Sequence, residues 1–240
     1  MAFVTLTKIN FKRLILRNTR FLIFDVASPI FFYLIYTQIF TGGQQLKVNI
    51  FISMTVFATL LSSIITVSNN IMSDRQQHFF RFMAVTPLSQ KLYYLSLSLV
   101  FIFLNVLQIL AMEIVAAFGT KLNLSLDKYL QILVIATVGS FALILIGAAI
   151  TFLGNSSFVN SIAYSIVFPL AIISGLWTPM NLMPSWLQQI GKLTPTYATV
   201  NLIHNFLQKQ PWSWNLFGKL GIWLLLAMGL LIICSRKSVD

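Results

Sequence analysis

"SGLWTPMNLMPSWLQQIGKLTPTYATV", residues 174–200, follows a long apolar run and then departs from the pattern of a membrane-spanning helix. It contains Pro179, Pro184 and Pro195, two tryptophans and a single lysine. Proline breaks a helix interior, and the residue before a proline disfavours helical backbone, so this stretch cannot form one continuous crossing helix. It nevertheless remains apolar, which predicts a segment that lies at or dips into a membrane without spanning it.

The composition of the whole chain is that of a membrane protein. Of its 240 residues, 58% are hydrophobic and only 9% are charged, and the mean hydropathy is +0.85. A water-soluble domain cannot cover so much apolar surface with polar side chains. The net charge of +11 would suggest nucleic acid in a soluble protein, but beside membrane spans it indicates basic residues at the cytoplasmic face. We therefore expect membrane lipid as a partner and no nucleic acid.

Six runs of the sequence are long enough to cross a membrane, since a helix needs about 20 apolar residues to do so. They are 21–40, 48–72, 92–118, 129–153, 158–176 and 216–234. Backbone groups in lipid must bond within their own segment, and the ten-residue alternation of a barrel is missing, so the spans are helices. The predicted fold is an all-α integral membrane protein with six transmembrane helices in a single domain, 1–240.

The basic residues predict the orientation of these spans. Ten Lys and Arg residues precede the first run, lie between the second and third, or follow the sixth, whereas six lie on the opposite face. Basic residues favour the cytoplasmic side, so both termini are predicted to be cytoplasmic in a multi-pass protein of the cell membrane. The turn GNSSF (154–158) between the fourth and fifth runs is cytoplasmic by parity, although it is uncharged.

Two segments on the cytoplasmic side are not spans. Residues 1–20 are basic and are predicted to form a helix, which either anchors the chain to anionic lipid or contacts a partner. Residues 73–91 form the largest inner loop, in which Ser73 can cap a short helix whose first turn contains Asp74 and Arg75.

Three apolar side chains share one face of that short helix. Phe79, Phe82 and Met83 stand at the spacing i, i+3 and i+4, which places side chains together on a helix. An exposed apolar face of this kind needs a cover. Both the membrane surface and a groove on a cytosolic protein fit, and the sequence leaves the two open.

The opposite face carries the proline-broken segment, 177–213. Its pieces 184–193 and 196–208 have the length of re-entrant or interfacial helices. Pro184 fits the first turn of one helix, and Pro195 breaks the chain before the next. Irregular backbone at membrane depth needs protein or a water-filled cavity around it. We therefore expect this segment to form a roof over the space between the helices.

Few polar groups interrupt the spans. Glu113 is the sole carboxylate in the middle to outer part of a predicted span, and Asp25 lies near the inner end of the first one. A buried ionisable group is a functional candidate, although a structural position near the outer headgroups also suits Glu113. Asn105 and Gln108 are interpreted as hydrogen-bonding links between helices.

The inventory of reactive residues argues against an enzyme. No G-x-x-x-x-G-K-[ST] motif is present, so the chain lacks the loop that holds nucleotide phosphates. Cys234 is the single cysteine, and His78 and His204 are predicted on opposite membrane faces, which excludes a zinc site built from them. We expect no catalytic residue, no metal and no cofactor bound by this chain.

Two motifs resemble those of a known family. Residues 174–200 are similar to the pattern G-x-x-x-P-x-x-x-[LM]-P-x-W-[LM]-x-x-[IL]-x-x-[LF]-x-P, and "SDRQQHFFRFMAVTPLSQKLYY" (73–94) is similar to a coupling-helix region with T-x-x-x-L-x-x-x-P-[LV]-[ST]. The usual start of that region, E-R-E-x-G-T, reads DRQQH here (74–78). The whole chain resembles the permease subunits of ABC-2 exporters, the membrane half of type-V ABC transporters.

This resemblance implies a partner and an assembly. A separately encoded ABC ATPase, in two copies, binds ATP-Mg and docks against residues 74–86 and the N-terminal helix. Two permease chains, identical or different, form the translocation path along their interface. The residues implied in ATPase coupling are Asp74, Arg75, Phe79, Phe82 and Met83.

The resemblance also implies a role for the outer segment and the kinds of cargo. The outer segment forms short re-entrant helices that close the exit. The implied extracellular gate comprises Pro179, Pro184, Trp186 and Pro195, and Glu113 is a candidate for the path. The six-span size is similar to small bacterial exporters of drugs or peptides, which includes multidrug resistance, while other members export polysaccharide, teichoic acid precursors or lipid.

Two alternatives from other classes stay open. A membrane-embedded structural or immunity-type protein would need no ATPase and no exposed Phe79, Phe82 and Met83. A proton- or sodium-coupled secondary transporter would use Glu113, but that class usually has several buried charges and repeated broken spans.

Overall fold

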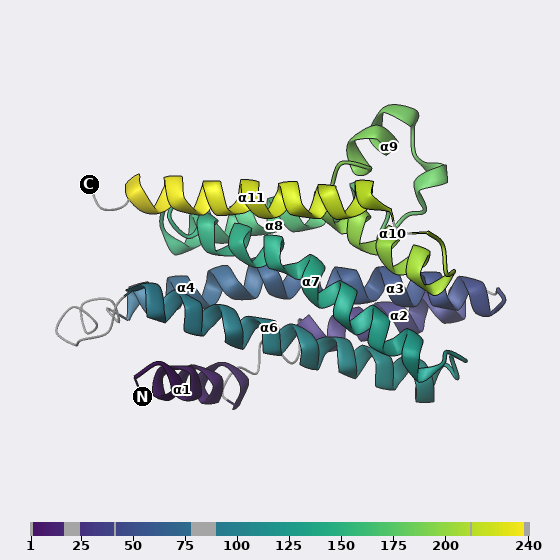
Figure 1. The fold of residues 1–240 in the computed structure, drawn as a ribbon, viewed down its shortest axis with the longest axis horizontal. Helices are drawn as coiled ribbons and strands as arrows, with labels where there is room; N and C mark the ends of the chain where they lie inside the picture. Colours follow the sequence, from purple (N-terminus) through teal and green to yellow (C-terminus); the bar gives the residue numbers. More distant parts are fainter. Residues whose placement is uncertain (1, 17–24, 41, 78–89, 212, 238–240) are drawn as a thin grey trace.

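The computed structural model describes residues 2–16, 25–40, 42–77, 90–211 and 213–237 (Figure 1). Within these ranges every regular element is a helix. In chain order they are α1 (Ala2–Leu16), α2 (Ser28–Ile39), α3 (Gln44–Leu61), the π-helix η2 (Ser62–Thr66), α4 (Val67–Gln76), α6 (Gln90–Ile114), the π-helix η3 (Val115–Gly119), α7 (Leu126–Ile150), α8 (Ser156–Ile173), the 3-10 helix η4 (Met180–Leu182), α9 (Ser185–Gly191), α10 (Pro195–Leu207) and α11 (Trp214–Lys237).

Five helices in the described ranges are long and apolar enough to cross a membrane. They are Gln44–Gln76, Leu92–Gly119, Leu126–Ile150, Ser156–Ile173 and Trp214–Ser235. These five correspond to the second to sixth predicted runs, and their ends differ by at most four residues. The first run, 21–40, contains α2, but its residues 21–24 lie outside the described ranges. A sixth crossing therefore stays a prediction.

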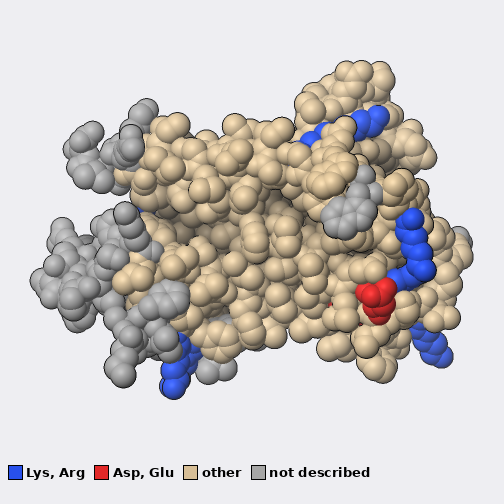
Figure 2. All heavy atoms as spheres, in the orientation of Figure 1, with Lys and Arg blue, Asp and Glu red and all other residues tan. Residues whose placement is uncertain are grey.

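The long helices run side by side along the longest axis of the molecule (Figure 1). α1 and the C-terminal ends of α4 and α11 lie at one end, which we call the α1 end, and α9 and α10 lie at the other, the α10 end. On the face in Figure 2, charged side chains gather toward the two ends and the middle is uncharged. An uncharged middle fits the apolar layer of a membrane, where a charge is costly.

The central helix is the continuous unit made by α3, η2 and α4. It is the most buried of the five spans, whereas α11 is the least buried and turns most of its side chains outward. Phe51, Phe57 and Ile64 of the central helix are at most 1% exposed. Most of the outward side chains of α8 and α11 are apolar, including Phe168, Leu225 and Ile233, although Ser157, Ser161 and Ser165 of α8 are exposed as well. Such surfaces suit lipid or a second membrane chain.

α7 approaches the π-helix η2 more closely than side chains would allow. A Cβ atom at Gly147 would lie 2.3 Å from the backbone oxygen of Ser63 and 3.1 Å from the Cα of Ile64. A π-helix widens one turn of an α-helix and exposes its carbonyl groups differently from their neighbours. Glycine at 147 is therefore what permits this contact, as small residues do at helix interfaces in membranes.

The helix predicted to begin at Ser73 does not begin there. α4 runs through Ser73 and Asp74 to Gln76, so these residues form the last turns of the central helix, and the predicted N-cap at Ser73 is wrong. The Ser73 hydroxyl accepts a hydrogen bond from the side chain of Gln77, at 3.1 Å, instead of capping a helix start. Because the helix of the second span continues through Ser73 and Asp74, no new helix start is needed there, and the Asp74 carboxylate pairs with Arg13 of α1.

Candidate functional site

An ion pair joins α1 to the end of the central helix. The two terminal nitrogens of Arg13 donate to the two carboxylate oxygens of Asp74, at 2.5 and 2.7 Å. The hydroxyl of Tyr93, on α6, donates to the same carboxylate. Asp74 is only 3% exposed. Three helices therefore meet at one buried carboxylate, in the bidentate geometry that makes an arginine pair strong and directional.

A second polar contact lies one turn away along α1. The side-chain nitrogen of Asn10 donates to the hydroxyl of Ser96, at 3.0 Å, and both residues are buried. The oxygen of Asn10 accepts from Arg13 at 3.3 Å. Leu6 and Leu14 lie one turn on either side of Asn10 and are buried as well. One stripe of α1 is thus fixed on the bundle, and we call the set Asn10, Arg13, Asp74, Tyr93 and Ser96 the α1 clamp.

Arg75 ties the same end of α4 to α7. Its guanidinium donates to the backbone oxygen of Thr151, and it lies 4.2 Å from the centre of the Phe152 ring, within the range of a cation–π contact. Together with the α1 clamp, this contact connects α1, α4, α6 and α7 immediately before residue 78. The four helices are therefore held together at the C-terminal end of α4, and we call this set of contacts the support at the α1 end.

The predicted coupling residues fall into two groups, those with described contacts and those outside the described ranges. Asp74 and Arg75 already bind groups of their own chain, so their side chains hold the end of α4 against α1 and α7. Whether they also contact an ATPase stays a prediction, and Phe79, Phe82 and Met83 lie outside the described residues. The sequence analysis missed Arg13 and Tyr93. A signal was available in the scarcity of acidic residues, because one of the five Asp and Glu residues of the chain, Asp74, lies in the predicted inner loop.

Polar side chains inside the spans link the helices to one another. Asn105 of α6 donates to the hydroxyls of Ser63 and Ser140, at 3.0 and 2.9 Å. Gln108 donates to the backbone oxygen of Ala58 at 3.0 Å and to that of Asp25. All of these contacts cross between helices that are distant in sequence. They agree with the interpretation of Asn105 and Gln108 as links, which in lipid are favoured over unpaired polar groups.

Glu113 lies in the last part of α6, toward the α10 end. It is 9% exposed, and its Oε1 atom has no hydrogen-bond partner in the described part of the chain. A buried, unpaired carboxylate oxygen is unusual and costly, which keeps Glu113 a candidate for function. Its place in a translocation path stays a prediction. Elsewhere in the described ranges, no three His, Cys, Asp or Glu side chains come close enough to hold a metal ion.

The proline-broken segment forms short helices at the predicted places. Pro179 precedes η4, Pro184 precedes α9, and Pro195 is the first residue of α10. The Thr194 hydroxyl caps α10 by accepting from the backbone N–H of Tyr197 at 3.3 Å. Each proline thus stands where a helix starts, where its missing N–H costs nothing.

The structure separates the predicted gate residues by burial. Pro195 is buried, because α10 packs on α7 where Gly139 meets Thr199. Trp186, on α9, is 62% exposed, and α9 projects from the bundle in Figure 1. α9 packs close to α8, since a Cβ at Gly191 would lie 2.2 Å from the backbone oxygen of Ile173. That these four residues act as a gate stays a prediction.

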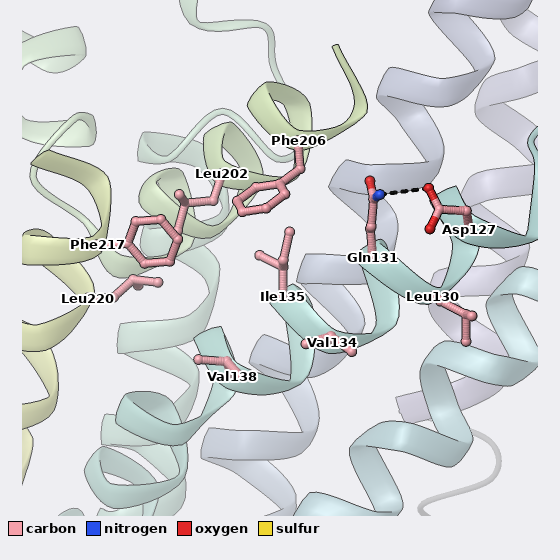
Figure 3. A pocket seen from close by; sticks show the side chains of 10 residues that line it. All are labelled: Asp127, Leu130, Gln131, Val134, Ile135, Val138, Leu202, Phe206, Phe217 and Leu220. Atoms are coloured by element: carbon pink, nitrogen blue, oxygen red, sulfur yellow. Dashed lines mark hydrogen bonds between the residues drawn. The ribbon is translucent and has the colours of Figure 1, made fainter. Parts of the chain in front are cut away.

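An apolar pocket of about 390 Å³ opens between α7, α10 and α11 at the α10 end. Figure 3 shows Phe206 and Phe217 on one side of it and Val134 and Val138 of α7 on the other. Its polar edge is Asp127, whose carboxylate accepts from the side-chain nitrogen of Gln131 at 2.8 Å (Figure 3). A pocket with such walls can take an alkyl chain or another apolar group.

Comparison with known proteins identifies the kind of protein that carries these features. Residues 1–207 match the family model described as "ABC-2 type transporter". The chain is also similar to a protein of Bacillus subtilis (strain 168) named as a transport permease, YvfS, with 27% identity over 190 residues, which is 76% of each chain. The match to the family model includes the α1 clamp, the segment 78–89 and α10. This chain therefore belongs to the ABC-2 type transporter family, whose members are multi-pass membrane permeases.

Proposed function

We propose that this chain is the permease subunit of an ATP-driven exporter and that a separate ABC ATPase supplies the energy. The observation that carries the proposal is the support built at the α1 end. Arg13, Asp74 and Arg75 join α1, α4, α6 and α7 directly before residue 78. A force applied to the segment 78–89 or to α1 would therefore reach four helices at once. Membership of the ABC-2 type transporter family supports the same reading.

The proposal includes a topology and an assembly. The chain crosses the cell membrane six times, with the α1 end and both termini in the cytoplasm and with α9 and α10 re-entering the membrane from outside. Two permease chains and two ATPase copies form the transporter. The outward apolar faces of α8 and α11 offer surfaces for a second chain. The cargo is a drug, a peptide or a lipid-like molecule, and polysaccharide or another lipid-linked cargo is the alternative.

The test is capture of the ATPase from native cells. The detergent-solubilised chain is expected to co-purify with an ATPase that carries the G-x-x-x-x-G-K-[ST] motif, identified by mass spectrometry. The Phe79→Asp/Phe82→Asp variant is expected to lose it, because two carboxylates would replace the apolar contact. Leu126→Asp is the matched control, since Leu126 is 76% exposed in the first turn of α7, where an acidic residue is tolerated.

Three outcomes of this experiment have distinct meanings. Loss with the double variant alone places the contact on the segment 78–89. Retention by the double variant keeps the transporter and moves the contact to α1. If no ATPase accompanies the native chain, the exporter assignment is wrong.

A second candidate function rests on Glu113, whose Oε1 atom is buried without a hydrogen-bond partner in the described ranges. In a proton- or sodium-coupled transporter this carboxylate would bind the coupling ion. Glu113→Gln is then expected to abolish uptake driven by an ion gradient in proteoliposomes. In the ATP-driven exporter we propose, transport by the native chain requires ATP and the partner ATPase, and uptake driven by an ion gradient without ATP would favour the second candidate.

A further inference from the structure

A second, polar pocket lies at the α10 end, between the link that follows α9, one face of α10 and the start of α11. Its volume is about 210 Å³. Its lining is rich in hydrogen-bond donors: Lys192, Tyr197, Asn201, Asn205, Ser213, Asn215 and Lys219. No carboxylate lines it, so the two ammonium groups make its charge positive. Nothing in the predicted gate or in the coupling site uses these residues.

Both lysines have N–H groups available to a ligand, and neither forms an ion pair with a carboxylate in the described part of the chain. The ammonium of Lys219 donates to the backbone oxygen of Lys192 at 3.0 Å, which holds it at the pocket and leaves two of its three N–H groups for a ligand. The side chain of Lys192 is exposed and has no ion pair or hydrogen bond within the described part of the chain. Trp223, one turn beyond Lys219 on α11, donates to the backbone oxygen of Leu193 at 2.7 Å and fixes the wall.

The depth of the pocket fits the headgroups of a membrane. The apolar span of α11 begins at Trp214, and Lys219 follows five residues later, which is about 7 Å along a helix axis. A lysine at that depth reaches the headgroup layer with its ammonium. Lysine, amide and hydroxyl groups are the donors that bind phosphate oxygens.

The polar pocket and the apolar pocket of Figure 3 lie on either side of a third hollow that shares lining residues with both. This hollow, of about 220 Å³, lies around the end of α10. It shares Asn205 and Ser213 with the polar pocket, and it shares Leu202 and Phe206 with the apolar one. A ligand with a charged head and an apolar tail could therefore occupy both sides of α10 at once, which a free ion would not need.

The geometry points to a binding site for an anionic phospholipid, with its phosphate held by Lys192 and Lys219 and an acyl chain in the apolar pocket. The chemistry shared with other ligands is the phosphate group, and the apolar pocket next to it selects the lipid over free phosphate. This inference goes beyond the transport function, because a lipid held at this position would stabilise α9 and α10 in either candidate transporter.

Native mass spectrometry of the full chain in detergent tests the inference. We expect phosphatidylglycerol to remain bound, and we expect phosphatidylcholine to bind less. Lys192→Gln/Lys219→Gln should weaken phosphatidylglycerol binding by about tenfold or more, because each lysine near a lipid surface contributes on the order of 1 kcal/mol. The control Lys47→Gln/Lys128→Gln removes two positive charges outside the pocket and should leave binding unchanged.

Further measurements distinguish the phosphate of a lipid from free phosphate, and further variants control for misfolding. Inorganic phosphate at millimolar concentration should not displace the lipid, and dihexanoyl phosphatidylglycerol should bind more weakly than the long-chain form. Displacement by inorganic phosphate would overturn the lipid assignment, as would equal loss in the control variant. Lys192→Arg/Lys219→Arg should retain binding. If the Lys192→Gln/Lys219→Gln variant does not fold, the single variant Lys192→Gln tests the inference. The Lys192 ammonium makes no hydrogen bond or ion pair in the described part of the chain, so its loss should not affect folding.

Discussion

Replacing Arg13 with methionine is expected to lower the free energy of unfolding by about 3 kcal/mol. The carboxylate of Asp74 is 3% exposed, and without Arg13 it would remain buried with the Tyr93 hydroxyl as its remaining described donor. Breaking a buried pair on one side costs about 3–5 kcal/mol, and the lower end applies because the Arg13 side chain is 31% exposed. Thermal unfolding of the purified chain in detergent measures the loss.

A double-mutant cycle isolates the pair. Asp74→Asn is expected to cost less than Arg13→Met, because Arg13 can turn its charge toward water and the new amide still accepts from Tyr93. The combined variant should be more stable than the sum of the two losses predicts, since the buried unpaired charge is then gone. Lys12→Met is the control, because Lys12 is exposed on the same helix. Equal losses for Arg13→Met and Lys12→Met would show that the ion pair contributes nothing.

Adding one methyl group at Gly147 is the second change with a large expected effect. In Gly147→Ala the new Cβ would lie 2.3 Å from the backbone oxygen of Ser63. No side-chain rotation can relieve that contact, so α7 must move away from η2, at a cost of about 3 kcal/mol. The melting temperature in detergent should fall by roughly 6–12 °C, on the scale for chains of this length.

Two other glycines serve as controls for Gly147→Ala. Gly221→Ala on α11 meets no atom within 4 Å and should be neutral or slightly stabilising, because alanine favours helix. Gly139→Ala meets the side chain of Thr199 at 2.3 Å, so adding Thr199→Ala should restore part of the lost stability. If Gly147→Ala melts like Gly221→Ala, the close approach of α7 to η2 does not occur.

Most of the secondary structure could be predicted from the sequence. The second to sixth spans were placed to within four residues because lipid leaves a long apolar segment only one way to satisfy its backbone. The short helices α9 and α10 followed from Pro184 and Pro195, which mark helix starts. The start predicted at Ser73 was wrong because the helix of the preceding span continues through this residue, and local capping rules do not separate a serine inside a helix from one at its start. The pair of Arg13 and Asp74 was also beyond local rules, because the two residues are 61 positions apart.

Apolarity and proline placement by themselves determined that this chain is a bundle of membrane helices with a broken segment at one end. The tertiary structure alone decided which polar side chains meet. It paired Arg13 with Asp74, placed Asn105 against Ser63 and Ser140, and brought Lys192 and Lys219 into one pocket. The reason is physical. Hydropathy acts on each segment separately through its transfer into lipid, whereas hydrogen bonds and ion pairs depend on the rotation and depth of each helix against its neighbours.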